Sequence, residues 1–526
     1  MIFDDTATGG TNAINFSDTI NSLTYEQTSG FHTTLIPDGV TLTIHGSAAN
    51  YGLIAGQGQA GTLILATNII AGGGSINLDN AGALLVDQGA NQDDNHNMVL
   101  DMSGLDALVM NGSSQGFIAV GGGGYGGTDR TRAAGTLYLA KTNQIYMKYN
   151  FRIGDNDTAN SPNLCAVYLG QTNSIVLGNN NDDFSTGFSG NTNLLAFTPG
   201  LVNPVLYVRS EYSATVPRVP TWIIANAGRL PSVGTNDFTG GTVDVMANDV
   251  RMGRAASGAN PALGVLTFDG GTFDANTIED GWQTVSAGGT GVGIINVNTN
   301  AASGTFGMLV VNNSLVLGDV IGTLTAGSAG TLNINGGLVL ASQIIAGGGE
   351  AAVTMNHGTL VATNGVGSPA APIATFNAVN ATLRVRLNGS AIVTNIVTTD
   401  LNASGVNTIT IDSMANVNGL TTFPIISYTG TAPVAGSFVK GDLPPGFAAN
   451  LVNNTAQKRI DLVIAPKATV TPHISSVSLF GTNLTVGGTN GFPSGHYYVL
   501  GSTNLGRPLD QWLPLSTNPF DIHGEF

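Results

Sequence analysis

Three copies of one short motif recur along the chain, and their spacing constrains the fold more than any other feature. Each copy has two strands in which apolar and polar residues alternate, joined by a turn at a Gly that closely follows Asp or Asn. The copies occupy residues 266–278, 332–344 and 353–365. The aligned glycines are Gly271, Gly337 and Gly358. The second interval is one period of about 21 residues and the first is three times a period of about 22 residues, and such a period is typical of the coils of a β-solenoid.

A second pair of segments, 137–145 and 167–175, matches at a longer offset, which fits one longer coil with an outward loop. One coil cannot bury its inward face alone, whereas stacked coils form a continuous core and pair their strands. Asn-Gly and Asp-Gly supply corners with positive φ, and stacked Asn amides can form ladders along the axis. A hairpin meander is the alternative, because Asp-Gly between alternating strands is also a hairpin signal. The recurring period favours the solenoid.

The same alignment predicts which side chains share the core of two successive coils. We expect parallel pairing and inward side chains at Leu332, Ile334, Leu338 and Leu340, stacked on Val353, Met355 and Leu360. The fold class that follows is all-β: a right-handed parallel β-helix (β-solenoid) followed by a small β-sandwich-like module.

Shifts in composition divide the chain into parts. We expect the β-helix over residues 1–465, with terminal capping coils from about residue 400, because an open solenoid end is an exposed sheet edge. Residues 466–473 have Pro at both margins and no periodicity, so they read as a linker. Residues 474–526 form a small C-terminal β-module, which we interpret as incomplete and as anchored by Trp512.

Composition and charge exclude some classes of function. Among 526 residues, 42% are hydrophobic and only 10% charged, so the chain is expected to fold rather than to be disordered. With 17 basic and 33 acidic residues, the net charge is −16. Nucleic acid and anionic lipid are therefore not expected partners, because phosphate neutralisation requires a basic surface.

Neither a leader nor a membrane span is visible in the sequence. Residues 1–5 lack a basic and apolar leader, so we expect that an export segment is missing before Met1. No run of about 18 apolar residues marks a membrane helix. The single cysteine, Cys165, lies in a predicted strand and has no His near it in the sequence. We therefore expect a small buried residue rather than a catalytic thiol.

The sharpest motif lies near the C-terminus. It comprises Gly481-Thr-Asn-Leu-Thr-Val-Gly-Gly, then Ser-Thr-Asn-Leu505, Gln-Trp512 and Asn518-Pro-Phe-Asp-Ile-His-Gly-Glu-Phe526. This pattern resembles the C-terminal β-module of exported bacterial proteins built on autotransporter-associated β-strand repeats, and residues 61–370 resemble the repeats. The resemblance implies a pectin-lyase-like right-handed β-helix, export and a surface or adhesin-like role, and it carries over no catalytic residue. Family members usually continue past Gly-Glu-Phe with a further strand.

Parallel β-helices also carry polysaccharide lyases, which use clustered carboxylates with Ca²⁺ or a basic residue. Three acidic clusters are candidates for such a site: Asp93-Asp94 beside His96, Asp155 with Asp157, and Asp182-Asp183. None has the alternate acidic ligands and the closing Glu of a self-contained Ca²⁺ loop. We interpret all three as polar excursions from the coils.

Other candidate ligand-binding residues are isolated. Asp129-Arg-Thr-Arg132 is the densest basic segment and could contact an acidic glycan, although a solvated loop is the simpler interpretation. Trp282 and Tyr125 are candidates for sugar stacking or for corner packing. The Gly-rich run 121–127 lacks the Gly-Lys-Ser/Thr ending of a phosphate-binding loop.

The sequence therefore predicts no catalytic, cofactor-binding or metal-binding residue, and no cofactor. We expect an extracellular structural or adhesin-like β-solenoid stalk that displays loops, secreted or at the cell surface. Extracellular polysaccharide or cell-surface components are the expected partners, together with self-association. The alternatives are a carbohydrate-active β-helix enzyme, a polysaccharide lyase or hydrolase, and a self-assembling extracellular filament subunit.

Overall fold

The computed structural model describes the chain apart from residues 48–50, 57–63, 81, 87–96, 114–115, 123–133, 156–163, 179–182, 191, 212–216, 229, 257–259, 285–288, 322–326, 467–470, 492–495, 505 and 522. It contains two compact units. The first comprises residues 1–416, 422–443 and 449–463, and the second comprises 417–421, 444–448 and 464–526. Each unit is described separately below.

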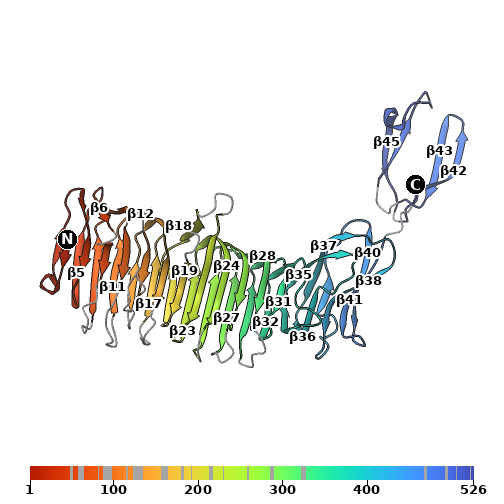
Figure 1. The fold of residues 1–526 in the computed structure, drawn as a ribbon. Coiled ribbons are helices and arrows are strands. Elements are labelled where there is room, and N and C mark those ends of the chain that lie inside the picture. Colours follow the sequence, from red (N-terminus) through yellow and green to blue (C-terminus); the bar gives the residue numbers. More distant parts are fainter. Residues whose placement is uncertain are drawn as a thin grey trace. The chain divides into compact units, whose positions relative to one another are not determined.

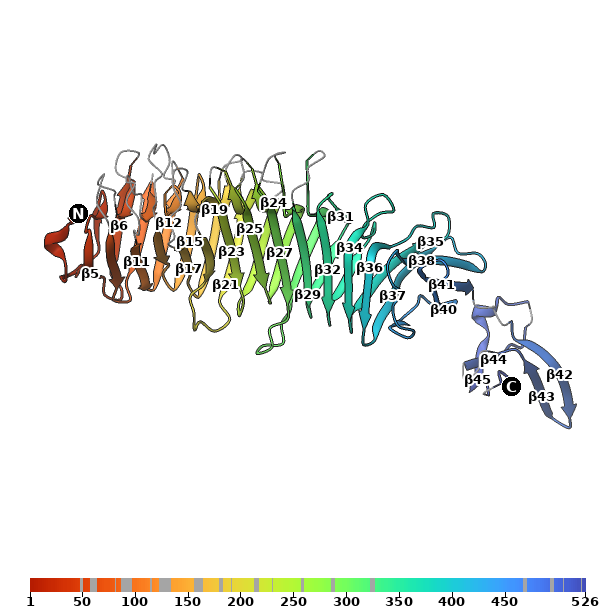
Figure 2. The same cartoon turned by 90° about the horizontal axis from the view of Figure 1, so that it is seen from below.

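The first unit is a parallel β-helix, in which successive coils add strands to three parallel ladders (Figure 1 and Figure 2). The third ladder has strands as far as β31 (Ile344–Ala346), and the other two continue beyond it. Sheet 1 is the ladder β2 (Thr11–Ala13), β5 (Ser29–Leu35), β8 (Leu65–Ala71), β11 (Asn97–Gly104), β14 (Gly135–Tyr138), β17 (Leu164–Leu169), β20 (Thr192–Phe197), β23 (Ser232–Phe238), β25 (Ala262–Phe268), β27 (Gly291–Asn298), β29 (Ala329–Asn335), β32 (Glu350–Asn356), β34 (Ile373–Val379), β36 (Ile396–Ser404) and β38 (Thr421–Tyr428). Strands β40 (Phe447–Asn454) and β41 (Arg459–Pro466) join the same sheet.

Sheets 2 and 3 follow sheet 1 in the coils up to β31, and sheet 2 alone follows it in the later coils. Sheet 2 is the ladder β3 (Asp18–Ile20), β6 (Thr41–Gly46), β9 (Ser75–Asn80), β12 (Ala107–Gly112), β15 (Thr142–Met147), β18 (Thr172–Leu177), β21 (Val205–Ser210), β30 (Leu338–Ala341), β33 (Thr359–Ala362), β35 (Thr382–Asn388), β37 (Asn407–Ala415) and β39 (Phe438–Lys440). Sheet 3 is the ladder β1 (Ile2–Phe3), β4 (Leu23–Tyr25), β7 (Gly52–Ala55), β10 (Ala83–Val86), β13 (Ile118–Val120), β16 (Phe151–Asp155), β19 (Asp183–Ser189), β22 (Val219–Ala227) and β31 (Ile344–Ala346).

Three long strands run through both sheet 2 and sheet 3 in the middle of the solenoid: β24 (Thr242–Ala255), β26 (Gly271–Asp280) and β28 (Gly307–Leu317). Strand β24 pairs with β21 through its first half and with β22 through its second half. The short helix η1 (Asp5–Ala7) lies between β1 and β2. The solenoid that the repeats predicted is therefore confirmed, and the strand ladders that join successive coils from β1 to β39 are parallel.

The strand register confirms the expected alignment of segments 137–145 and 167–175, and it corrects the expected number of coils between Gly271 and Gly337. Leu137 lies opposite Val167, so the offset between these two segments is one coil. Gly271 lies opposite Gly307, and the pairing of Met308 with Leu338 puts Gly307 opposite Gly337. The chain from Gly271 to Gly337 thus forms two coils, which meet at Gly307, and the three equal coils expected there were wrong.

The core prediction for two neighbouring coils is partly wrong. Leu332 pairs in parallel with Val353 and both are buried, as expected. Leu338 and Leu340, however, point outward, and Val339 is the inward residue that pairs with Leu360. The corner at Gly336, where φ is +79°, turns the chain so that the alternation restarts one residue later.

Buried amides support the corners, as the Asn-rich composition predicted. The Asn143 side chain donates to the Asn173 side-chain oxygen at 2.8 Å, one coil further on, and both residues are buried. Asn173 in turn donates to the carbonyl oxygens of Gly170 and Val205. These bonds satisfy carbonyl groups that the tight corner takes out of the ladder.

The second unit contains two antiparallel hairpins, β42 (His473–Phe480) with β43 (Asn483–Thr489), and β44 (His496–Gly501) with β45 (Leu513–Pro519). The short helix η2 (Leu509–Gln511) precedes β45. Trp512, the expected anchor, is only half-buried, and its indole N–H donates to the Arg507 carbonyl oxygen. The rings that pack together are instead those of Tyr497, Phe520 and Phe526.

Candidate functional site

The acidic clusters singled out in the sequence do not form a site among the described residues. Asp183 is held by Arg152, whose Nε and Nη2 donate to its two carboxylate oxygens at 2.9 and 3.1 Å. Asp155 ends strand β16, but its side chain lies outside the description. The other candidates also lie outside the described residues: Asp93, Asp94, His96, Tyr125, Asp129–Arg132, Asp157 and Asp182.

Several of these residues belong to connections of the same kind in chain order. Residues 56–64, 87–96, 121–134 and 156–163 each lead from a strand of sheet 3 to the next strand of sheet 1. Successive strands in a ladder are about 4.8 Å apart. The described strand ends that precede three of these connections, Ala55, Val86 and Val120, therefore lie opposite one another in one row of sheet 3.

Trp282, the other aromatic candidate, lies at the centre of a charged cluster on sheet 3. It immediately precedes Gln283, which bridges Ala255 and Val320, so its ladder neighbours are Arg254 and Asp319. The guanidinium groups of Arg254 and Arg251 lie 4.9 and 5.5 Å from the centre of the Trp282 ring. The ring thus has cation–π partners at the corner, which supports the packing interpretation more than direct sugar stacking.

The carboxyl groups around Trp282 are shifted toward their neutral forms. Strand pairing sets Glu279 opposite Arg251, at 3.7 Å between carboxylate oxygen and Nε. Burial raises the pKa of Glu279, and the nearby Asp319 and Asp249 add to that rise, although Arg251 opposes it. Burial also raises the pKa of Asp319. Two such groups beside a pair of arginines could serve as proton donors near a bound anionic ligand.

Beneath this cluster lies a fully buried carboxyl group. Asp280 has no solvent exposure and points into the core, and burial raises the pKa of its side chain well above the ordinary value. Only the Thr331 backbone N–H favours the charged form, and it does not reach hydrogen-bond geometry with either carboxyl oxygen. Since an unpaired buried charge is costly, Asp280 is a neutral structural group at moderate pH.

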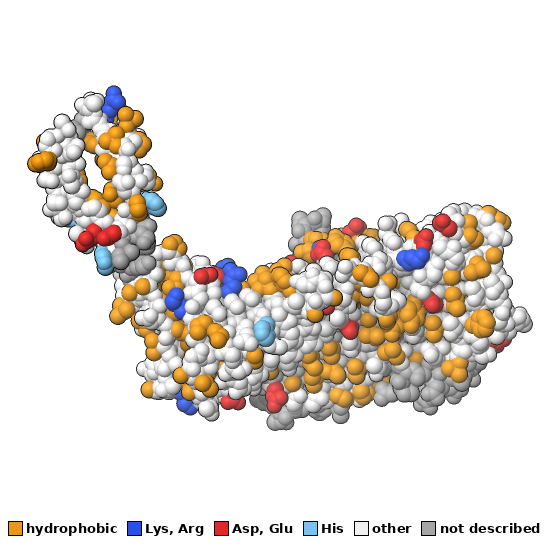
Figure 3. Space-filling model, turned by 180° about the vertical axis from the view of Figure 1, so that it is seen from behind, with side chains coloured by type: hydrophobic (Ala, Val, Ile, Leu, Met, Phe, Trp, Pro, Cys, Tyr) orange, Lys and Arg blue, Asp and Glu red, His pale blue; other side chains and the backbone are white. Residues whose placement is uncertain are grey.

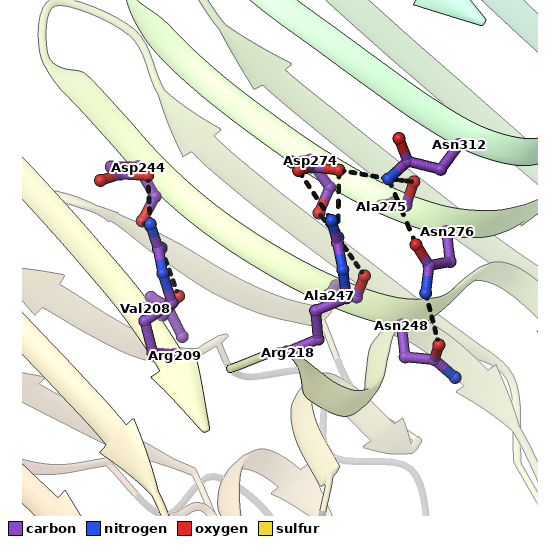
Figure 4. A network of polar contacts seen from close by, with 10 residues as sticks. All are labelled: Val208, Arg209, Arg218, Asp244, Ala247, Asn248, Asp274, Ala275, Asn276 and Asn312. Atoms are coloured by element: carbon purple, nitrogen blue, oxygen red, sulfur yellow. Dashed lines mark hydrogen bonds and ion pairs between the residues drawn. The ribbon is translucent and has the colours of Figure 1, made fainter. Parts of the chain in front are cut away.

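A second polar network lies on sheet 2 (Figure 4). Arg218, which precedes β22, donates from Nη1 and Nη2 to the two carboxylate oxygens of Asp274 at 3.0 and 2.8 Å. It also donates to the Ala247 carbonyl oxygen. The side chains of Arg218 and Asp274 are 10% and 21% exposed, so the pair is well shielded. This contact ties the connection between β21 and β22 to the sheet.

An amide ladder continues this network along the solenoid axis. Asn312 donates to the side-chain oxygens of both Asp274 and Asn276, and Asn276 donates to Asn248 at 2.8 Å. Arg209 forms a parallel contact with Asp244 at 2.6 Å and lies over the Tyr207 ring. Because each charged group here has a partner, the network (Figure 4) is structural rather than an open ligand site.

The outward face of sheet 1 changes character along the axis. Between β5 and β27 it carries an apolar strip, which we define as Phe31, Leu35, Leu65, Ile69, Val99, Tyr138, Leu164, Tyr168, Leu194, Val233, Leu263, Val265, Val292 and Ile294. From β27 onward, polar pairs appear instead, as Asn333 donates to Asn296 and Asn402 to Asn377. Figure 3 shows rows of hydrophobic side chains over the N-terminal half of the solenoid.

One shallow hollow lies within the apolar strip. It has a volume of about 350 Å³ and is lined by Asn97, Val99, Thr136, Tyr138, Leu164 and Tyr168. The rings of Tyr138 and Tyr168 stack on one another at 4.6 Å and 12°. Burial raises the pKa of Tyr138, and the neighbouring Tyr168 and Asp101 contribute to that rise.

Within the described residues, no group of His, Cys, Asp and Glu could hold a metal ion. No described helix is long and apolar enough to cross a membrane. Comparisons of the chain with protein-family models, with curated proteins and with solved structures find no match. A function is therefore inferred from the fold and from the side chains described above.

Proposed function

We propose that this chain is an extracellular, adhesin-like β-solenoid stalk that displays loops at the cell surface. The observation that carries this proposal is the long run of parallel ladders, in which successive coils repeat the same sheets. Such an architecture grows by addition of coils and is stabilised by contacts between neighbours. It supports a spacer whose length is set by the number of coils.

Two further observations support a display role. The connections 56–64, 87–96, 121–134 and 156–163 all join a strand of sheet 3 to the next strand of sheet 1, and connections between strands are where binding residues are often found. The charged pairs on the sheets, such as Arg218 with Asp274, are committed to contacts within the solenoid. The motif resemblance to autotransporter-associated repeat proteins supports export and a surface position.

The first test is location. An antibody against the folded solenoid should label intact producing cells, or the protein should be recovered from their medium. Labelling that appears only after lysis would overturn the proposal. The second test is binding without turnover: the full chain should bind intact cells or extracellular polysaccharide and release no product from it.

A carbohydrate-active enzyme is the second candidate, and the cluster around Trp282 is the observation that favours it. Two arginines could bind the carboxylates of an acidic polysaccharide, and Glu279 has the raised pKa of a proton donor. Pectin and alginate are suitable substrates for this test. Turnover that Glu279→Gln abolishes would establish the enzyme, if the matched variant Glu350→Gln, on the exposed face of sheet 1, remains active.

A further inference from the structure

The apolar strip on sheet 1 has no covering element among the described residues. Its members alternate along each strand with buried core residues, so they face away from the solenoid interior. Phe31 and Leu65 are 51% and 50% exposed. Most other members are half-buried, and outward threonines (Thr67, Thr136, Thr192 and Thr235) lie among them in the ladder. A mainly apolar surface of this extent on a folded protein marks an interaction site.

We infer that two copies of this chain pair through the apolar strip, sheet against sheet, about a two-fold axis. Nine strands, from β5 to β27, carry the strip. At about 4.8 Å between strands and about 3.3 Å per residue, the strip covers about 40 Å by 20 Å, or about 800 Å². That is the area which each partner buries in a stable interface of standard size.

The charge distribution favours a second copy as the partner. The chain carries a net charge of −16, so two copies repel each other over most surfaces. The outward positions of β5 to β27, as far as the structure describes them, hold no Lys or Arg and only the carboxylates Asp101 and Asp237. Both carboxylates accept hydrogen bonds within their own turns, from Ser103 and Thr239. Two copies of the apolar strip can therefore face each other with no like charges between them apart from these hydrogen-bonded carboxylates.

The geometry also favours a protein sheet over a glycan. Two flat β-sheets pack about 10 Å apart with interdigitating aliphatic side chains, which is the composition of this strip. Glycan binding instead requires exposed aromatic faces flanked by polar groups. The aromatic pair in the strip, Tyr138 and Tyr168, uses one face of each ring for its own stacking.

The test is the oligomeric state of the full chain by sedimentation velocity at concentrations of about 1–100 μM, a range suited to an interface of this size. The strip variant Leu164→Lys with Leu194→Lys places four lysines across the two-fold interface. The matched control, Thr354→Lys with Asn377→Lys, adds the same charge on the polar part of sheet 1. Circular dichroism should show that both variants retain the β-structure of the wild type.

We expect a wild-type dimer that persists in about 0.5 M salt. At this concentration the electrostatic screening length is about 4 Å, so a dimer held by surface ion pairs would dissociate. The strip variant should dissociate with a constant at least about 100-fold larger, as unpaired buried charges require. The control variant should dimerise like the wild type. A wild type that is monomeric at 100 μM, with or without binding to glycan particles, would overturn the inference. So would a folded strip variant that still dimerises.

Discussion

Replacement of Trp222 with Ala should loosen the middle of the solenoid. Trp222 is fully buried, and its ring centre lies 4.0 Å from that of Phe184 and 5.4 Å from that of Phe273. Phe184 in turn stacks on Phe151 at 4.4 Å. Strands β16, β19, β22 and β26 therefore share one continuous column of rings inside the core.

The expected cost follows from burial and from one unsatisfied group. Truncation of a buried Trp to Ala costs about 3–5 kcal/mol, because it removes apolar contacts and leaves a cavity. The Trp222 indole N–H, however, is buried without a hydrogen-bond partner, which costs the folded state about 1–3 kcal/mol. Trp222→Phe removes that N–H and keeps a ring against Phe184. We therefore expect Trp222→Phe to cost less than about 1.5 kcal/mol.

Hydrogen exchange is the appropriate assay, because a solenoid opens locally around a weakened coil. In Trp222→Ala, exchange should accelerate by about 100-fold or more in β16, β19, β22 and β26. Exchange in β32 and β34, more than two coils away, should stay at the wild-type rate. Equal damage from the Ala and Phe variants would refute the reasoning about the unsatisfied N–H. Unchanged exchange in the Ala variant would refute the role of the aromatic column.

Three further predictions concern the polar groups and the coil register. Because burial raises the pKa of Asp280, its stabilising contribution is present below the ordinary carboxyl pKa and is lost as pH rises through the raised value. Asp280→Asn should therefore reduce the fall in Tm between pH 5 and pH 8, and an unchanged fall would contradict this. Arg218→Ala should cost about 1–3 kcal/mol and expose the β21–β22 connection to proteolysis. Arg209→Ala, whose partner Asp244 is 54% exposed, should cost less than about 1 kcal/mol, and the reverse order would be inconsistent with the shielding. Deletion of residues 143–172, one coil by register, should leave a folded solenoid by circular dichroism, whereas deletion of 143–157 should not.

The sequence alone predicted the architecture because its signal is local and repeated. The matched segments 137–145 and 167–175 are one coil apart, as their offset required. The count of coils between Gly271 and Gly337 failed because both coils, 36 residues from Gly271 to Gly307 and 30 residues from Gly307 to Gly337, are longer than the assumed period of about 22 residues. A fixed period cannot represent coils of unequal length. The outward position of Leu338 was missed because the Gly336 corner shifts the alternation by one residue.

The candidate site was harder to predict than the fold. Trp282 was identified as an aromatic at a corner, but its neighbours were not. Arg254 and Asp319 are far from Trp282 in the sequence, one coil before it and one coil after it, and only the ladder register brings them together. Unequal coil lengths hide this relation in the sequence. An alignment of coils that allowed for excursions would have paired Arg251 with Glu279 and disclosed the cluster.

The aromatic column and the charged cluster are two faces of the same strands. Strand β22 carries Trp222 inward, and the next strand, β24, carries Arg251 outward, opposite Glu279 on β26. Successive side chains of a strand point to opposite faces of one sheet, so only the backbone of that sheet separates the core from the cluster. Packing inside thus holds the guanidinium and carboxyl groups outside in register. Hence a loss of ligand binding or turnover in Trp222→Ala would not identify Trp222 as a ligand contact, whereas the same loss in Glu279→Gln, at unchanged exchange in β26, would place the chemistry at the cluster.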